Sequence, residues 1–176
     1  LTRITSSDDF KIRHIIDSIS SAAFYPELLN DSLRMLDLGC GGGFPSIPLA
    51  ALNSNLEITA MDSEGMKGRC VADAAQRLGL DNLKTLHARG REASLKPEYK
   101  AQFDIVSARA VATADKLIKE ARNFLKPGGR ILLYKTPDAI QKESKLTDRE
   151  AKKFKFRQEL SEIFTLPNNA GQRQFL

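Results

Sequence analysis

Three glycines at alternate positions, Gly39, Gly41 and Gly43, follow the short apolar run of residues 36–38. Because glycine has no Cβ, these positions can adopt a positive φ and let a ligand approach the backbone. A dinucleotide-binding turn would have its third glycine where Phe44 stands, and a phosphate-binding loop would have Lys followed by Ser or Thr. Neither pattern is present. The turn therefore favours a nucleoside ligand that carries an amino acid in place of phosphates, and S-adenosylmethionine is such a ligand.

Asp62 lies 23 residues after Gly39, at the end of the next predicted strand. A carboxylate at this point of an open parallel sheet can accept hydrogen bonds from both ribose hydroxyls of an adenosine. Alternatively, Asp62 caps the helix that starts near Glu64. Asp37 has an alternative of the same kind, because its carboxylate could simply bond the amides of the glycine turn.

Four further candidates follow the third and fourth predicted strands: Gly90, Arg91, Glu92 and Arg109. Ligands of open parallel sheets bind beyond the carboxyl ends of the strands, so these residues are expected at the same site. Gly90 and Arg91 could border the adenine, and Glu92 or a backbone amide could read its Watson–Crick edge. Arg109 is expected next to the departing methyl group. Alternatively, it is a surface arginine paired with a nearby carboxylate.

The possible methyl acceptors can be reduced in number, because the fourth predicted strand lacks the motifs that several of them need. Its end reads Ser107-Ala-Arg-Ala-Val111, without the Asn or Asp followed by two prolines that methylation of an exocyclic amine usually needs. Methylation at a pyrimidine carbon needs a thiolate, but Cys40 lies in the glycine turn and Cys70 is expected to face the core. No set of Lys, Asp and Glu is arranged to activate a ribose hydroxyl. What remains is an acceptor that is already nucleophilic, and guanine N7 is one example, because its lone pair needs alignment at about 3 Å rather than a general base.

The elements that must position these residues alternate between strands and helices. Such alternation requires parallel strands joined by right-handed crossovers, with helices on both faces. The predicted fold is therefore a doubly wound α/β sheet, mostly parallel and seven-stranded, whose last strand is incomplete. Strands are expected over residues 34–39, 56–61, 83–87, 102–108, 130–134, 159–166 and 173–176, with a hairpin at 167–171, and helices over 10–19, 47–52, 67–78, 112–125 and 137–156.

Composition limits the class of protein. The 176 residues suit one globular domain, and the longest apolar run, residues 47–52, is far shorter than the roughly 20 residues of a membrane span. Two cysteines and two histidines form no metal spacing, so we expect no metal, a reducing compartment and a cytoplasmic location. A net charge of +5 mildly favours a polyanionic partner.

These motifs together resemble the 16S ribosomal RNA guanine-N7 methyltransferases, also called the glucose-inhibited division protein B family. The resemblance covers essentially the whole chain. The paired prolines after the glycine turn and the segment around Arg109 are its more specific features. It rests on Leu1-Thr2, Arg13-His-Ile-Ile-Asp-Ser18, Leu36-Asp-Leu-Gly with Gly41 and Gly43, Phe44-Pro45, Ile47-Pro48-Leu49, Asp62-Ser63 and Ser107-Ala-Arg-Ala110.

The resemblance implies a monomeric, S-adenosylmethionine-dependent enzyme of class I type that methylates N7 of one guanine in the small-subunit RNA. It also implies one domain over residues 1–176, with an N-terminal helical segment at 1–30, a cofactor-binding core at 33–135 and a C-terminal helix with antiparallel strands at 136–176. His14 and Asp17 match a pair that lies near the site in the family, although they could equally be a helix face against the sheet. Arg109 is the expected positioning residue, and the expected cofactor contacts are Gly39, Gly41, Gly43, Phe44, Asp62, Ser63, Gly90, Arg91 and Arg109.

The chain departs from the family pattern at three positions. Ser46 stands where the family usually has Gly, Met66-Lys67 replaces a basic pair, and Cys70 replaces an aromatic or aliphatic residue. The family's N-terminal helical segment and final strand are largely missing, which is expected of a truncated or partly resolved chain.

Two other functions are compatible with part of this interpretation. A small-molecule or protein methyltransferase would retain the glycine turn and Asp62 but need no phosphate-facing cations, and an RNA-binding assembly factor would retain the sheet but bind no cofactor. Phe44 is the one aromatic ring expected near the methyl group, where it is predicted to pack over the cofactor. The candidate phosphate contacts are Lys67, Arg69, Arg77, Arg89, Arg91 and Arg109.

Overall fold

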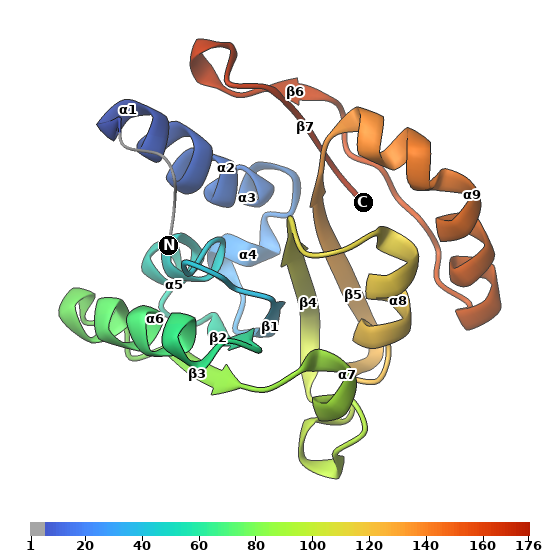
Figure 1. The fold of residues 1–176 in the computed structure, drawn as a ribbon, viewed down its shortest axis with the longest axis horizontal. Helices are drawn as coiled ribbons and strands as arrows, with labels where there is room; N and C mark the ends of the chain where they lie inside the picture. The colour runs from blue at the N-terminus through green and yellow to red at the C-terminus, as the bar shows by residue number, and fades with distance from the viewer. Residues whose placement is uncertain (1–5) are drawn as a thin grey trace.

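A seven-stranded sheet forms the centre of the protein (Figure 1). The computed structural model describes residues 6–176, so Leu1 and Thr2, which contribute to the resemblance, lie outside the described residues. The strand order is β3-β2-β1-β4-β5-β7-β6; β1 to β5 pair in parallel, whereas β7 is antiparallel to β5 and β6. The predicted doubly wound, mostly parallel sheet is confirmed. Its strands are β1 (Arg34–Leu38), β2 (Glu57–Asp62), β3 (Leu83–His87), β4 (Phe103–Arg109), β5 (Leu125–Lys135), β6 (Phe164–Thr165) and β7 (Gln172–Phe175).

Helices cover both faces of this sheet, as parallel strands require (Figure 1). The longer ones follow β2, β4 and β5, and a chain of short helices precedes β1. They are α1 (Ser7–Phe10), η1 (Lys11–Ile16), α2 (Asp17–Ile19), α3 (Ser21–Phe24), α4 (Glu27–Asn30), α5 (Ser46–Leu52), α6 (Gly65–Leu78), α7 (Gly90–Ala93), η2 (Pro97–Tyr99), α8 (Ala114–Ala121), α9 (Pro137–Phe154) and η3 (Pro167–Asn169).

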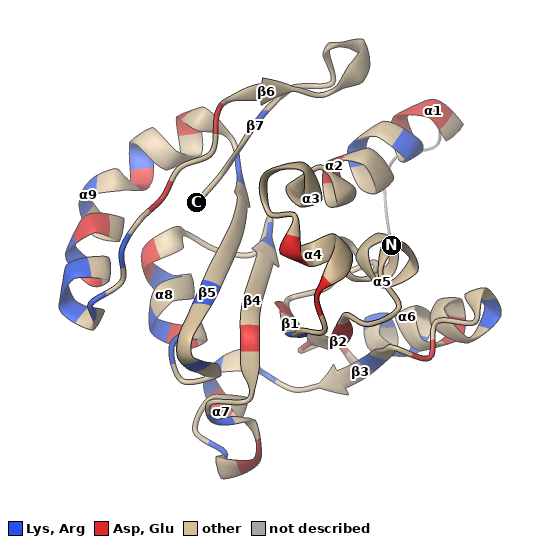
Figure 2. Ribbon diagram, turned by 180° about the vertical axis from the view of Figure 1, so that it is seen from behind, with Lys and Arg blue, Asp and Glu red and all other residues tan. Residues whose placement is uncertain are grey.

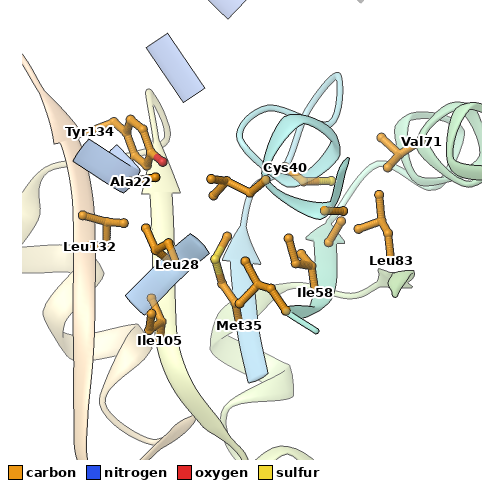
Figure 3. Packing of buried hydrophobic residues seen from close by; sticks show 14 of the residues in the cluster. Ala22, Leu28, Met35, Cys40, Ile58, Val71, Leu83, Ile105, Leu132 and Tyr134 are labelled. Atoms are coloured by element: carbon orange, nitrogen blue, oxygen red, sulfur yellow. The ribbon is translucent and has the colours of Figure 1, made fainter. Parts of the chain in front are cut away.

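Adjacent residues of the central strands supply two separate cores, because successive side chains of a strand point to opposite faces. Met35 and Ile105 belong to the cluster shared with α3, α4, α5 and α6, which Figure 3 shows at close range. Leu36 and Val106 belong to the cluster shared with α7 and α8. Burying each of these side chains contributes about 1.5–3 kcal/mol. The sheet is thereby a rigid frame that fixes where its strands end.

The N-terminal helical stretch begins earlier than the predicted residue 10. Ser6 is its N-cap, and the Ser6 hydroxyl accepts a hydrogen bond from the Asp9 N–H at 3.5 Å. Its middle turn, η1, is a π-helix. Such turns are rare and frequently occur at functional sites. In this protein the turn carries His14.

Two predictions about helices were wrong. The helix expected over residues 112–125 is α8, which ends at Ala121 because Leu125 already pairs with Phe103 in the sheet. Cys70, expected to face the core, is exposed. The buried side of α6 is formed by Gly68, Val71 and Ala75 at helical spacing, and Cys70 lies one position off that stripe.

The C-terminal hairpin is confirmed, but its first strand is shorter than predicted. The strand expected over residues 159–166 is only β6, because β7 offers it two ladder partners, Gln172 and Arg173. Residues 156–163 are an extended segment without strand pairing. The turn at 167–171 contains η3, and the last strand is β7.

Candidate functional site

A cavity of about 1380 Å³ opens beyond the carboxyl ends of β1, β2, β4 and β5. Single small-molecule sites are typically about 300–1,000 Å³, so this cavity has room for a nucleotide-sized ligand and a second reacting group. Its position is the crevice where open parallel sheets bind ligands. Residues from the glycine turn, the ends of β2 and β4 and the N-terminal helix line it.

The glycine turn has the backbone conformation that its sequence predicted. φ is +69° at Gly39, +54° at Gly41 and +87° at Gly43. Gly39 and Gly41 line the cavity, whereas Gly43 is buried beside α5, where a Cβ would lie 2.5 Å from the Ile47 Cδ1 atom. A Cβ on Gly41 would lie no closer than 3.9 Å to the nearest protein atom. The space beside Gly41 is therefore left to a ligand.

Asp62 and Ser63 form the next part of the same wall. One Asp62 carboxylate oxygen accepts a hydrogen bond from the Gly41 N–H at 2.9 Å, and the other accepts one from the Glu64 N–H at 2.8 Å. Asp62 therefore does not cap α6, whose N-cap is Glu64, but its carboxylate fixes the chain just before that helix and also fixes the glycine turn. Each oxygen has a second lone pair, so two ribose hydroxyls can still be accepted.

Asp37 lies beneath the glycine turn and is buried. Its carboxylate accepts hydrogen bonds from the hydroxyls of Ser46 at 2.6 Å and Ser107 at 2.9 Å, so the alternative that it bonds the glycine-turn amides was wrong. Burial raises its pKa to about 6, although both hydroxyls oppose the shift. The unusual Ser46 therefore has a partner, and Asp37 joins β1, α5 and β4.

Arg109 is held on the opposite wall by the N-terminal helix. Its guanidinium donates to Asp17 Oδ2 at 3.1 Å and to the carbonyl of Arg13 at 3.0 Å, and lies 3.1 Å from His14 Nδ1. Arg173 donates to the other Asp17 oxygen at 3.0 Å. The alternative of an arginine paired with a carboxylate is thus observed, and the paired guanidinium lines the cavity.

His14 is neutral in this arrangement. A guanidinium can only donate, so His14 Nδ1 must accept from Arg109. Burial lowers the pKa of His14, and the positive charge of Arg109 lowers it further, against the opposing effect of Asp17. The pair that the resemblance suggested is therefore at the cavity and in direct contact with the candidate positioning residue.

An aromatic cluster joins the two walls. The rings of His14 and Phe44 stack with centroids 4.6 Å apart at 16°, and Phe10 meets both rings edge-on at 5.2 and 5.6 Å. The Arg109 guanidinium carbon lies 5.6 Å from the centroid of Phe44. Phe44 thus lines the cavity as predicted, with the N-terminal helix against its ring.

Other predicted residues lie away from these walls, except Lys67, which lines the cavity. Gly90 and Arg91 are in α7 and do not line the cavity; a Cβ on Gly90 would overlap the Glu120 carboxylate, so helix packing also requires a glycine at this position. Among the predicted phosphate contacts, Lys67 pairs with Glu64 at 2.7 Å and Arg77 with Asp73 at 3.0 Å, whereas Arg69, Arg89 and Arg91 are exposed.

Sequence reasoning missed Arg173 and the serine partners of Asp37. No local spacing connects Arg173 to Asp17, which is 156 positions earlier. In the described residues there is no group of three or more His, Cys, Asp or Glu side chains placed to hold a metal ion. Within residues 6–176, no helix is long and apolar enough to cross a membrane.

Comparisons with known proteins agree with this geometry. The family model for rRNA small subunit methyltransferase G matches residues 1–164. Ribosomal RNA small subunit methyltransferase G of Lactobacillus delbrueckii subsp. bulgaricus is 33% identical over 175 residues, which cover 98% of this chain and 72% of that protein.

Solved structures share the fold at lower identity. TYW2 of P. horikoshii in complex with MeSAdo has a TM-score of 0.70 at 14% identity, covering 98% of this chain and 62% of that one. Fibrillarin of Aeropyrum pernix with natively bound S-adenosyl-L-methionine has a TM-score of 0.65 at 14% identity, covering 89% of this chain and 72% of that one. These two likenesses support the fold alone.

Proposed function

Since the chain belongs to the rRNA small subunit methyltransferase G family, we propose that it transfers a methyl group from S-adenosylmethionine to N7 of a guanine in the 16S rRNA of the small ribosomal subunit. The observation that carries this proposal is the cavity with two unlike walls. Glycine backbone and the Asp62 carboxylate form one wall, and the Arg109 guanidinium with the neutral His14 ring forms the other.

The first wall fits S-adenosylmethionine, which supplies a methyl group on a positively charged sulfur when bound. The positive φ values of Gly39 and Gly41 leave their backbone open to the cavity, and Asp62 has lone pairs for the ribose hydroxyls. Ser63 lies beside Asp62 in the cavity lining. Gly43 supports the turn from below, and Phe44 borders the cavity between the walls. Gly90 and Arg91, in the α7 helix that follows β3, lie outside the cavity lining, and their contact with the cofactor remains a proposal.

The second wall suits an acceptor that is already nucleophilic. Guanine N7 carries a lone pair and no proton, so the protein has to hold the base in line with the methyl group rather than remove a proton. Arg109 is suited to this positioning task because Asp17, His14 and the Arg13 carbonyl fix its guanidinium. Burial raises the pKa of Cys40 to about 12, so this thiol supplies no thiolate for methylation at carbon.

We also propose the domain organisation, the oligomeric state, the metal use and the location of the protein. Residues 1–176 would function as one domain with the subdivisions given above, as a monomer and without a metal ion. The site of action would be the cytoplasm, where the small ribosomal subunit is assembled.

The proposal is tested by calorimetric titration with S-adenosylmethionine and with NAD, followed by incubation with labelled S-adenosylmethionine and unmethylated small-subunit particles. We expect S-adenosylmethionine to bind, NAD not to bind, and label to enter the RNA. Binding without label in RNA would favour a small-molecule or protein acceptor. Absence of S-adenosylmethionine binding would favour the non-catalytic assembly factor.

A further inference from the structure

The positive charge of the protein is concentrated in one part of the chain. Residues 114–159 contain 13 Lys and Arg against 7 Asp and Glu, whereas all other residues together contain 14 against 15. The whole excess of +5 therefore comes from α8, β5, α9 and the segment that follows α9. Figure 2 shows the Lys and Arg positions recurring along α9 and into that segment.

Three of the seven acidic residues of this region are engaged in packing the helices, whereas Asp138, Asp148 and Glu159 are exposed. Asp115 and Glu150 are buried between α8 and α9, with Lys119 3.6 Å from each. Glu143 accepts hydrogen bonds from the Ala114 N–H at 2.7 Å and from Lys135 at 2.9 Å. These three carboxylates hold the helices together, so the outer surface is more positive than the sequence count indicates.

The exposed basic residues of α9 lie along one side of the helix. Lys142, Lys145, Arg149 and Lys152 are spaced three, four and three residues apart, which places them on a single face. We call these four residues the α9 track. The opposite face of α9 is buried through Thr147, Glu150 and Ala151.

Three members of the α9 track have no partner. Within residues 6–176, no hydrogen bond or ion pair engages the side chains of Lys142, Lys145 and Lys152, while Arg149 pairs with Glu150 at 3.1 Å. By contrast, Lys67 and Arg77 of α6 are each paired with a neighbouring carboxylate. Of the predicted phosphate contacts on α6, only Arg69 is without a described partner, whereas α9 presents three unpartnered lysines on one face.

The α9 track begins about one helical turn beyond the cavity. Thr136, the N-cap of α9, and Ala139, in its first turn, both line the cavity. The 18 residues of α9 extend about 27 Å from there. At the far end, Arg122, the C-cap of α8, and Lys153 lie over the Phe154 ring, 4.5 and 5.2 Å from its centroid. A row of cations therefore leads away from the place where the target base would be held.

We propose that the α9 track binds the phosphate backbone of the RNA that flanks the methylated guanine. The inference rests on the proposed function and names a surface that this function would use. Phosphate contacts fix register without reading sequence, which suits lysines on a helix face. Each neutralised phosphate releases counterions, so affinity must fall as salt rises.

The test replaces the three unpartnered lysines together: Lys142→Gln, Lys145→Gln and Lys152→Gln. Gln keeps the helix propensity, and no described contact is lost. The matched control replaces three exposed lysines elsewhere, Lys84→Gln, Lys96→Gln and Lys100→Gln. Affinity for naked 16S rRNA and for small-subunit particles is measured over a range of salt concentrations, together with S-adenosylmethionine affinity and the circular dichroism of each variant.

We expect the α9 variant to bind both RNA and particles at least about tenfold more weakly, and the slope of log affinity against log salt to fall by about 2–3, near one per lost phosphate contact. The control should change far less, and S-adenosylmethionine affinity should stay unchanged in both. Equal losses in the two variants, or wild-type binding by the α9 variant, would overturn the inference. A loss seen with particles but not with naked RNA would overturn it in favour of a protein partner. If wild-type protein fails to methylate RNA, the proposed function fails instead.

Discussion

The two walls of the cavity are built in different ways. The glycine wall, formed by Gly39, Gly41 and Asp62, comes from residues close in sequence, and backbone conformation defines it. The arginine wall, formed by His14, Asp17, Arg109 and Arg173, is a side-chain network whose ion pairs connect residues 92 and 156 positions apart. This difference indicates that the glycine wall, proposed for the cofactor, is fixed by the strand ends themselves, whereas the arginine wall, proposed for the acceptor, depends on charges that a single substitution can remove.

Arg109→Ala should have the largest effect, because it disconnects the N-terminal helix from β4 at three contacts. Misplacing a reacting group by about 1 Å can cost about 100-fold in rate, and we expect methyl transfer to fall by at least that factor. S-adenosylmethionine affinity, which belongs to the glycine wall, should change less than about tenfold. Steady-state kinetics and calorimetry measure the two effects.

The control for Arg109→Ala is Arg34→Ala, which removes an exposed arginine at the start of β1, at the opposite end of the strand from the cavity. It should keep wild-type turnover. If folded Arg109→Ala protein kept wild-type turnover, Arg109 would not be the residue that positions the acceptor.

Asp37 joins the two walls, since its serine partners come from α5 and β4. Its pKa is raised from 3.8 to about 6, so the folded state binds the proton more tightly than the unfolded state. The resulting stability is fully present below pH 3.8 and is lost as pH rises through about 6. It amounts to about 3 kcal/mol, and Asp37→Asn should lack this dependence.

Urea unfolding of both proteins from pH 4 to pH 8 tests this expectation. The wild-type free energy of unfolding should fall relative to that of Asp37→Asn as pH rises, while contributions from other carboxylates cancel in the difference. A difference that stays constant with pH would mean that Asp37 does not titrate as its burial requires.

Gly41→Ala should weaken S-adenosylmethionine binding by about tenfold, because the added Cβ meets no protein atom within 3.9 Å and borders the cavity. Gly79→Ala is the matched control: its φ is +67° against +54° at Gly41, its Cβ also meets open space, and it ends α6 away from the cavity. Both should lose about 1–2 kcal/mol of stability from left-handed strain. Calorimetry should separate them, and equal affinities would show that the space beside Gly41 is not used by the ligand.

The smallest expected effect concerns His14. Its pKa is lowered by burial and by Arg109, so it should titrate below 6.5. Stability from the neutral ring is present above pH 6.5 and lost as pH falls through the lowered pKa. In Arg109→Ala the pKa of His14 should rise, since one of the two lowering causes is removed. NMR titration measures both proteins, and a lower pKa in the variant would contradict the contact with Arg109.

The glycine wall could be predicted from sequence because its determinants are local. Strand, turn and helix follow one another within residues 34–52. The carboxylate of Asp62 ends β2, and the carboxyl ends of parallel strands lie at the same edge of the sheet. The confirmed positive φ values follow from glycine spacing alone. Cys70 shows the limit of such reasoning, since a one-position error in helical phase moved it from the core to the surface.

The arginine wall could not be predicted in full. Pairing of Arg109 with a carboxylate was foreseen, but the sequence does not say which one, and His14 and Asp17 were identified only through the resemblance. Arg173 had no signal at all, because its role depends on β7 lying antiparallel to β5 beside the N-terminal helix. The partners of Asp37 likewise depend on a register that places Ser107 opposite it in β4.

The most direct test of the account is to identify the modified nucleoside. Unmethylated small-subunit particles are incubated with the protein and labelled S-adenosylmethionine, and the 16S rRNA is digested and separated into nucleosides. We expect the label to co-elute with 7-methylguanosine and to disappear when Arg109→Ala protein is used. Label in a different nucleoside would contradict the assignment of guanine N7 as the acceptor, and label found only outside the RNA would contradict the proposed substrate.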